Sequence, residues 1–136
     1  MIKDNFWKNK NIFITGIAGF VGSNLAKNLI KNGANLIGIT KSKKVDSLLF
    51  YENLDKKVNL FFGEITNKEL LKSIFAKYNI EICFHLAAQV EVGLAKRYPF
   101  STWETNVRGT YTLLEVIREN KSSLKAIIVA SSDKAY

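Results

Sequence analysis

Three glycines at spacings of three, Gly16, Gly19 and Gly22, form the stretch of this sequence best suited to chemistry. Gly16 would let the chain turn sharply off a strand, Gly19 would leave room for a phosphate at the backbone, and Gly22 would let a helix pack tightly on a sheet. Helix-start amides favour a diphosphate. The spacing therefore predicts a dinucleotide site with its pyrophosphate near Phe20 and Val21, and the alternative is a loop that merely turns tightly.

The neighbouring residues supply the context that this interpretation needs. Residues 12–14 form a short apolar run typical of a buried parallel strand. Val21, Leu25 and Leu29 then follow at helical spacing. A strand, a glycine turn and a helix in this order favour nucleotide binding over a chance match.

The rest of the chain alternates strand and helix patterns. Strands are predicted at residues 36–40, 58–62, 80–86 and 124–131, with a short helix at 47–54. Thr66 and Glu69 have the form of a capping box for the next helix. Pro99 starts a long helix that carries one stripe of residues, Trp103, Val107, Thr110, Leu114 and Ile117. We expect an α/β fold, a doubly wound parallel (Rossmann) sheet of about five strands in the order 3-2-1-4-5.

Ligands of such sheets bind at the carboxyl ends of the strands, so the residues after the second strand bear on the choice of cofactor. Thr40 and Lys41 stand there, with Lys43 and Lys44 close behind, and no carboxylate is present to repel a 2′-phosphate. This pattern favours NADP over NAD. The alternative is a solvated lysine loop.

Composition narrows the class of protein. The 136 residues are enough for one domain with a real core, and 47% of them are hydrophobic. No apolar run approaches a membrane span, and the single cysteine, Cys83, excludes an internal disulfide and argues against a zinc site. The net charge of +8 comes from lysines spread along the chain, which suits a phosphate-rich ligand better than nucleic acid. We expect a cytoplasmic protein without a metal, a nucleic-acid partner or a membrane partner.

The form Thr15-Gly-x-x-Gly-x-x-Gly resembles the extended short-chain dehydrogenase/reductase family of NAD-dependent sugar-nucleotide epimerases and dehydratases. The segments 6–10, 103–106 and 131–136 are most similar to its CDP-glucose 4,6-dehydratase group. Two positions depart from the pattern: Val21 stands where that group commonly has lysine, and Glu64 stands where the family usually has aspartate.

The resemblance implies a set of cofactor-binding residues along the carboxyl edge. Asn106 is expected to tie the long helix to the neighbouring strand, and His85 is interpreted as structural rather than catalytic. The implied cofactor contacts are Gly16, Ala18, Gly19, Phe20, Val21, Gly22, Thr40, Lys41, Glu64, Ile65, Leu86, Ala87, Ala88, Gln89 and Asn106.

The resemblance also implies catalytic roles for Ser132, Asp133 and Lys134. Ser132 would bind the C4 hydroxyl of a sugar, Asp133 would protonate the leaving C6 hydroxyl, and Lys134 would take the place of the base at C5. The alternative is that these residues form a polar turn after a buried strand.

The family's Tyr-x-x-x-Lys pair is absent, because no tyrosine here has a lysine four residues later. We therefore expect residues 1–136 to be a truncated NAD(P)-binding domain without the C-terminal substrate domain, and inactive alone. A nucleoside-diphosphate sugar and a homodimer partner are expected for the full-length enzyme. The alternatives are a fragment of a sugar-nucleotide 4-epimerase and a nucleotide-binding module without chemistry.

Overall fold

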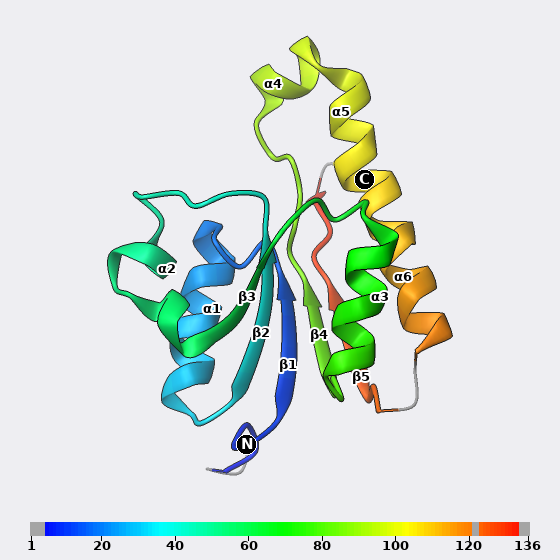
Figure 1. Cartoon of the computed structure of the whole chain (residues 1–136). Coiled ribbons are helices and arrows are strands. Elements are labelled where there is room, and N and C mark those ends of the chain that lie inside the picture. The colour runs from blue at the N-terminus through cyan, green and yellow to red at the C-terminus, as the bar shows by residue number, and fades with distance from the viewer. Residues whose placement is uncertain (1–4, 121–122, 134–136) are drawn as a thin grey trace.

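A five-stranded parallel sheet forms the centre of the molecule (Figure 1). The computed structural model describes residues 5–120 and 123–133. The strands lie in the order β3-β2-β1-β4-β5, which confirms the predicted topology. The two strands that flank β1 are in register with it, since Phe13 lies opposite Ile37 on one side and Cys83 on the other. The strand bounds are β1 (Asn11–Thr15), β2 (Asn35–Thr40), β3 (Val58–Phe62), β4 (Ile82–His85) and β5 (Ala126–Val129).

Helices cover both faces of the sheet (Figure 1). α1 (Phe20–Lys31), α2 (Leu48–Tyr51) and the 3₁₀ turn η1 (Leu54–Lys57) pack on one face. α3 (Lys68–Lys77) and α6 (Gly109–Glu119) pack on the other. Side chains of β1 alternate between the two layers, because Ile12 and Ile14 join the first core and Phe13 joins the second. Among the described residues, no helix is both long and apolar enough to cross a membrane.

The segment between β4 and α6 differs from its prediction. α4 (Val92–Arg97) lies between the predicted strand at 80–86 and Pro99, where no element was predicted. α5 (Pro99–Trp103) is joined to α6 by a π-helical turn, η2 (Glu104–Arg108). The predicted stripe is also not one buried face. Trp103 is 66% exposed and Leu114 is 42% exposed, whereas Ile117 is buried. The buried side of α6 is formed instead by Gly109, Thr112, Leu113, Val116 and Ile117.

The capping box predicted before α3 is displaced by one residue. Asn67, rather than Thr66, is the N-cap, and its Oδ1 atom accepts a hydrogen bond from the Leu70 amide at 3.1 Å. Asparagine is at least as good a cap as threonine, so either residue could begin the helix on the basis of N-cap preference alone. The helix therefore begins at Lys68, and Glu69 lies in its first turn.

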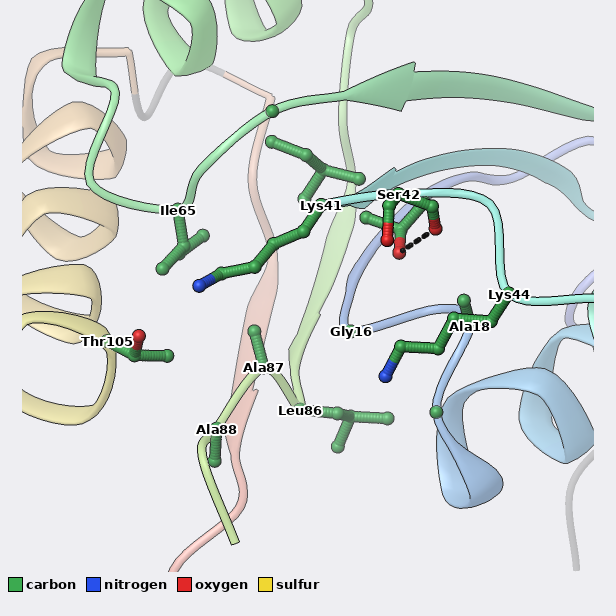
Figure 2. A pocket seen from close by; sticks show the side chains of 14 residues that line it. Gly16, Ala18, Lys41, Ser42, Lys44, Ile65, Leu86, Ala87, Ala88 and Thr105 are labelled. Atoms are coloured by element: carbon green, nitrogen blue, oxygen red, sulfur yellow. Dashed lines mark hydrogen bonds between the residues drawn. The ribbon is translucent and has the colours of Figure 1, made fainter. Parts of the chain in front are cut away.

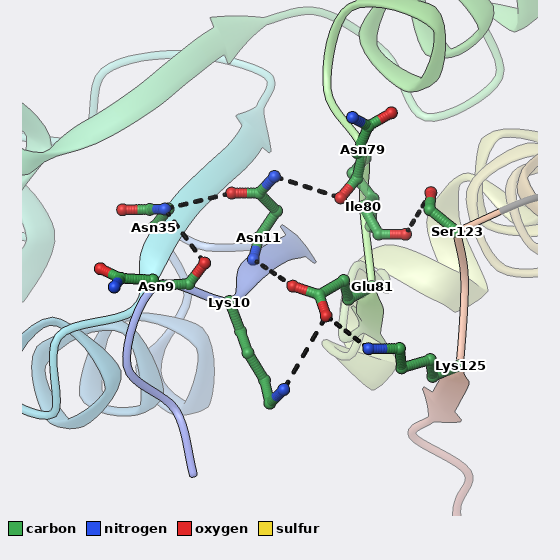
Figure 3. A network of polar contacts seen from close by, with 9 residues as sticks. All are labelled: Asn9, Lys10, Asn11, Asn35, Asn79, Ile80, Glu81, Ser123 and Lys125. Atoms are coloured by element: carbon green, nitrogen blue, oxygen red, sulfur yellow. Dashed lines mark hydrogen bonds and ion pairs between the residues drawn. The ribbon is translucent and has the colours of Figure 1, made fainter. Parts of the chain in front are cut away.

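Polar side chains close the amino-terminal edge of the sheet (Figure 3). The Glu81 carboxylate accepts a hydrogen bond from the Asn11 amide at 3.2 Å, and it pairs with Lys125 at 2.8 Å and Lys10 at 3.8 Å. The Asn11 side chain donates to the Asn79 carbonyl and accepts from the Asn35 side chain. These bonds link β1, β2, β4 and the start of β5 at the end of the sheet opposite the predicted site.

Candidate functional site

A cavity of about 230 Å³ opens at the carboxyl ends of the strands (Figure 2). It lies where the turns after β1, β2, β3 and β4 meet, as expected for a ligand site in a doubly wound sheet. No carboxylate is among the described residues that line it. The lining residues are Gly16, Ala18, Gly19, Ile39, Thr40, Lys41, Ser42, Lys44, Gly63, Ile65, Leu86, Ala87, Ala88 and Thr105.

The glycine turn fits close against the end of β4. Gly16 has φ +67°, and a Cβ atom there would lie 2.8 Å from the Ala87 nitrogen, so both its conformation and its surroundings require glycine. A Cβ on Gly19 would meet only the Gly16 oxygen, at 3.2 Å, and the rest of its surroundings is open. Gly22 packs against Gly16 and Ile17 of the turn itself rather than against the sheet.

The start of α1 leaves its first amides available to a ligand. Gly19 is the N-cap and has no side chain to accept hydrogen bonds from them. The amides of Phe20 and Val21 therefore meet the requirements of an anion seat. The Ser23 hydroxyl donates to the Gly19 carbonyl at 2.7 Å and holds the turn to the helix.

A second, more open cavity of about 480 Å³ lies beside the first and shares Ala18, Gly19 and Lys44 with it. Phe20, Asp46 and Ser47 also line it. The buried Ser47 hydroxyl donates to the Ala18 carbonyl at 2.7 Å, which fixes the segment after β2 against the glycine turn. A long ligand could thus pass over Gly19 from one cavity to the other.

Two lysines extend from the segment after β2 over the first cavity (Figure 2). Lys41 pairs with Glu64 at 3.0 Å, so the acidic residue after β3 is engaged with a lysine that was expected to meet a phosphate. No such ion pair involves Lys44 within the described parts of the chain, and its side chain extends toward the glycine turn. Lys43 instead stands over the Phe50 ring at 5.7 Å.

His85 is 3% exposed and lies beneath the site rather than in it. Its Nδ1 atom lies 2.7 Å from the Thr15 hydroxyl and its Nε2 atom 2.9 Å from the Thr110 hydroxyl. Burial lowers the pKa of His85 below its ordinary value of 6.5, which favours the neutral ring. These contacts agree with the interpretation of His85 as structural.

Asn106 connects the helical segment to the end of β4, as expected. Its Oδ1 atom accepts from the Gln89 amide at 2.7 Å, and its Nδ2 atom donates to the Gln89 carbonyl at 3.0 Å. Both residues therefore support the wall of the first cavity without lining it.

The structure brings most of the predicted cofactor residues together. Phe20 lines the second cavity, Val21 is exposed at the start of α1, and Gly22 is buried behind the turn. Two lining residues were not predicted from the sequence, Ile39 and Thr105. Ile39 lies inside the buried strand β2 and Thr105 lies in a helical turn, where only its place next to Asn106 could have indicated it. The predicted residues that line the first cavity are Gly16, Ala18, Gly19, Thr40, Lys41, Ile65, Leu86, Ala87 and Ala88.

The predicted catalytic residues follow β5 at the same edge of the sheet. Ser132 and Asp133 are exposed, and the Ser132 hydroxyl lies 3.4 Å from Asp133 Oδ1. Neither residue lines one of the two cavities described above. Lys134 lies outside the described residues. The described residues also include no group of three or more His, Cys, Asp or Glu side chains placed to hold a metal ion.

Comparisons with known proteins agree with this fold and identify the family of the chain. The GDP-mannose 4,6 dehydratase family matches residues 13–136. The chain is 38% identical over 137 residues to the CDP-glucose 4,6-dehydratase of Salmonella typhimurium. The alignment covers 100% of this chain and 38% of that protein.

Two solved structures show the same architecture. The Thermotoga maritima UDP-glucose 4-epimerase, solved with UDP-glucose, has a TM-score of 0.78 and 35% identity, covering 90% of this chain and 38% of that one. The Bifidobacterium longum UDP-glucose 4-epimerase, solved with NAD+ and UDP, has a TM-score of 0.81 and 26% identity. The match covers 93% of this chain and 38% of that one. The chain thus spans about 38% of the length of these relatives.

Proposed function

Because the chain belongs to the GDP-mannose 4,6 dehydratase family, we propose that it is the dinucleotide-binding part of a sugar-nucleotide 4,6-dehydratase. The observation that carries this proposal is the cavity beside the glycine turn, where Gly19 leaves the first amides of α1 uncovered. The CDP-glucose 4,6-dehydratase relative supports the dehydratase reaction over others of the family.

A sugar-nucleotide epimerase is the second candidate, favoured by the similarity to two UDP-glucose 4-epimerase structures. The residues after β5 distinguish the two reactions, because an acid at Asp133 suits the loss of a C6 hydroxyl, which epimerisation does not require. A binding module without chemistry would keep the cavity and make no use of Ser132 and Asp133.

The cofactor of this site is a nicotinamide dinucleotide, and we propose a weak preference for NADP. Lys44 supports it, since it lines both cavities and the lining of the first includes no described carboxylate. The Lys41–Glu64 pair limits the preference, because a 2′-phosphate would compete with Glu64 for Lys41. NADP should bind more tightly than NAD, and the difference should shrink as salt rises. Tighter binding of NAD at every ionic strength would overturn this preference.

A nicotinamide dinucleotide held by the glycine turn would supply the hydride acceptor for C4 of the sugar and the hydride donor for C6. The C4 hydroxyl proton would pass to the tyrosine base that the family's Tyr-x-x-x-Lys pair provides. The Ser132 hydroxyl would hold the C4 oxygen, and Asp133 would protonate the C6 hydroxyl as it leaves. Lys134 would remove the C5 proton, so that the elements of water are lost across C5 and C6, and a proton would return to C5 as the hydride enters at C6. The substrate is a nucleoside-diphosphate hexose, and the cytoplasm is the proposed compartment.

An apolar face on the helical segment supports the proposal that the full-length enzyme is a homodimer. These side chains are between 42% and 79% exposed, and they follow helical spacing along α5, η2 and α6. A two-fold pairing of this face with a second copy would cover it. The residues of the face are Phe100, Trp103, Val107, Tyr111 and Leu114.

The proposal is tested by calorimetric titration of NAD and NADP into the purified chain. Gly19→Val should reduce binding at least about a hundredfold, because its branched side chain would occupy the place of the pyrophosphate. Gly93→Val is the matched control, since a Cβ there meets only Glu91, at 3.5 Å, and its affinity should match the unsubstituted chain. Equal affinities in all three proteins would overturn the placement.

Turnover by the purified chain tests the proposed catalytic roles. We expect the 136 residues alone to bind the dinucleotide and to convert no nucleoside-diphosphate hexose, because the sequence holds no tyrosine with a lysine four residues later. Loss of a positioned general base costs roughly 10²–10⁴ in rate. Appearance of a 4-keto-6-deoxy product would show that the catalytic set is complete within this chain.

A further inference from the structure

A continuous line of hydrogen bonds runs under the wall of the first cavity. The Thr15 hydroxyl accepts from the amides of Leu86 and Ala87, each at 3.1 Å, and it contacts His85 Nδ1. On the other side of the ring, His85 Nε2 contacts the Thr110 hydroxyl, which donates to the Asn106 carbonyl at 2.7 Å. The line therefore joins β1, β4 and the π-helical turn η2, which are far apart in the sequence.

The protons of this line can be assigned from both ends. A hydroxyl has one proton and two lone pairs, so Thr15, which accepts from two amides, has its proton left for His85 Nδ1. The Thr110 proton is used on the Asn106 carbonyl, so Thr110 must accept from His85 Nε2. Both ends require a neutral ring with its proton on Nε2.

We infer that His85, in its neutral Nε2–H form, is a positioning residue that holds the Leu86–Ala87 wall of the dinucleotide cavity to the η2 turn. This inference rests on the proposed dinucleotide site and assigns to His85 an effect on its geometry. The wall and the glycine turn are in close contact, since a Cβ on Gly16 would lie 2.9 Å from the Ala87 Cα atom. A shift of the wall would therefore change the shape of the site.

The protonation state can be read directly, because His85 is the only histidine of the chain. Long-range proton–nitrogen correlation spectra of the ¹⁵N-labelled chain should show a protonated Nε2 and an unprotonated Nδ1. This readout needs no cofactor, so it stands even if the dinucleotide proposal fails. A proton on Nδ1, or a charged ring at neutral pH, would overturn the inference.

The link to the site is tested with variants of Thr110. Thr110→Val should weaken dinucleotide binding about threefold to tenfold and disturb the His85 nitrogen signals, and Thr110→Ser should restore both. Thr112→Val on the same helix is the control, because Thr112 is buried but is no member of the line. Equal losses in Thr110→Val and Thr112→Val, or no rescue by serine, would show a merely structural role. Absence of binding in the unsubstituted chain would instead count against the proposed function.

Discussion

The two ends of the parallel sheet use polar side chains in opposite ways. At the amino end, Glu81, Asn11 and their neighbours reach across the strands and occupy one another's hydrogen-bonding groups (Figure 3). At the carboxyl end, the bonds of Thr15 and His85 lie below the surface, and the surface above them stays open as a cavity (Figure 2). Polar side chains at the amino end therefore connect the strands to one another, whereas those at the carboxyl end support the wall of a cavity.

The largest effect on stability is expected from Thr15→Val at the carboxyl end. The Leu86 amide would keep a second acceptor, the Thr15 carbonyl at 3.3 Å, but the Ala87 amide and His85 Nδ1 would lose their partner. Leaving two such groups unpaired should lower the free energy of unfolding by about 2–3 kcal/mol. Urea denaturation measures the loss. Thr15→Ser keeps the hydroxyl as a control, and an unchanged midpoint in Thr15→Val would contradict the role given to this bond.

A smaller effect, of a different kind, is expected from Glu81→Ala at the amino end. The Asn11 amide would lose its acceptor, and the ion pairs with exposed Lys125 and with Lys10, 3.8 Å away, add little, so the free energy of unfolding should fall by about 1–2 kcal/mol. Dinucleotide affinity should not change, because this edge is remote from the cavity. Glu115→Gln, which breaks an exposed pair on α6, is the control for loss of charge. A large loss of affinity in Glu81→Ala would break the comparison.

The dependence of stability on pH separates the two ends further. Burial lowers the pKa of His85 below 6.5 in the folded state, so the unfolded chain binds more protons and stability should fall as pH drops below about 6.5. The hydrogen bond from Lys125, more than any other group, lowers the pKa of Glu81 below 4.5, so its contribution is present above that value and is lost as pH falls further.

Each group can change the free energy of unfolding by at most about 1.4 kcal/mol per pH unit. Thermal unfolding is measured between pH 7 and pH 3 for the unsubstituted chain and for Glu81→Gln. The variant should lack only the loss of stability below about pH 4.5, and the difference between the two series gives the contribution of the Glu81 carboxylate. A flat profile between pH 7 and pH 5 would mean that His85 is not held neutral by burial.

The local pattern of the sequence predicts the strands, the helices and the glycine turn. It does not predict the side-chain hydrogen bonds that connect segments far apart in the sequence. The run at 12–14, the glycine spacing and the alternation of strands and helices are local features, and they lead to the observed strand order. The N-cap is Asn67 rather than Thr66, because two adjacent residues are both good caps and the capping-box spacing cannot choose between them. The contacts of His85 could not be predicted, because its partners lie 70 and 25 residues away in the sequence.

The exposed face on the helical segment shows a second limit. Periodicity identifies apolar residues on one side of a helix but does not say whether a sheet or another molecule covers them. Here α6 turns Leu113 and Val116 to the sheet, and Leu114 is left exposed. Apolar residues at helical spacing therefore mark a buried face in one part of the chain and an exposed face in another.

The most direct test of the contrast between the ends is to map amide chemical shifts of the ¹⁵N-labelled chain as NAD or NADP is added. We expect changes at Phe20, Val21 and Ala87, around the glycine turn, and none at Asn11 or Glu81. Changes centred on the amino end, or the absence of any change at saturating dinucleotide, would contradict the claim that the carboxyl edge is the binding site.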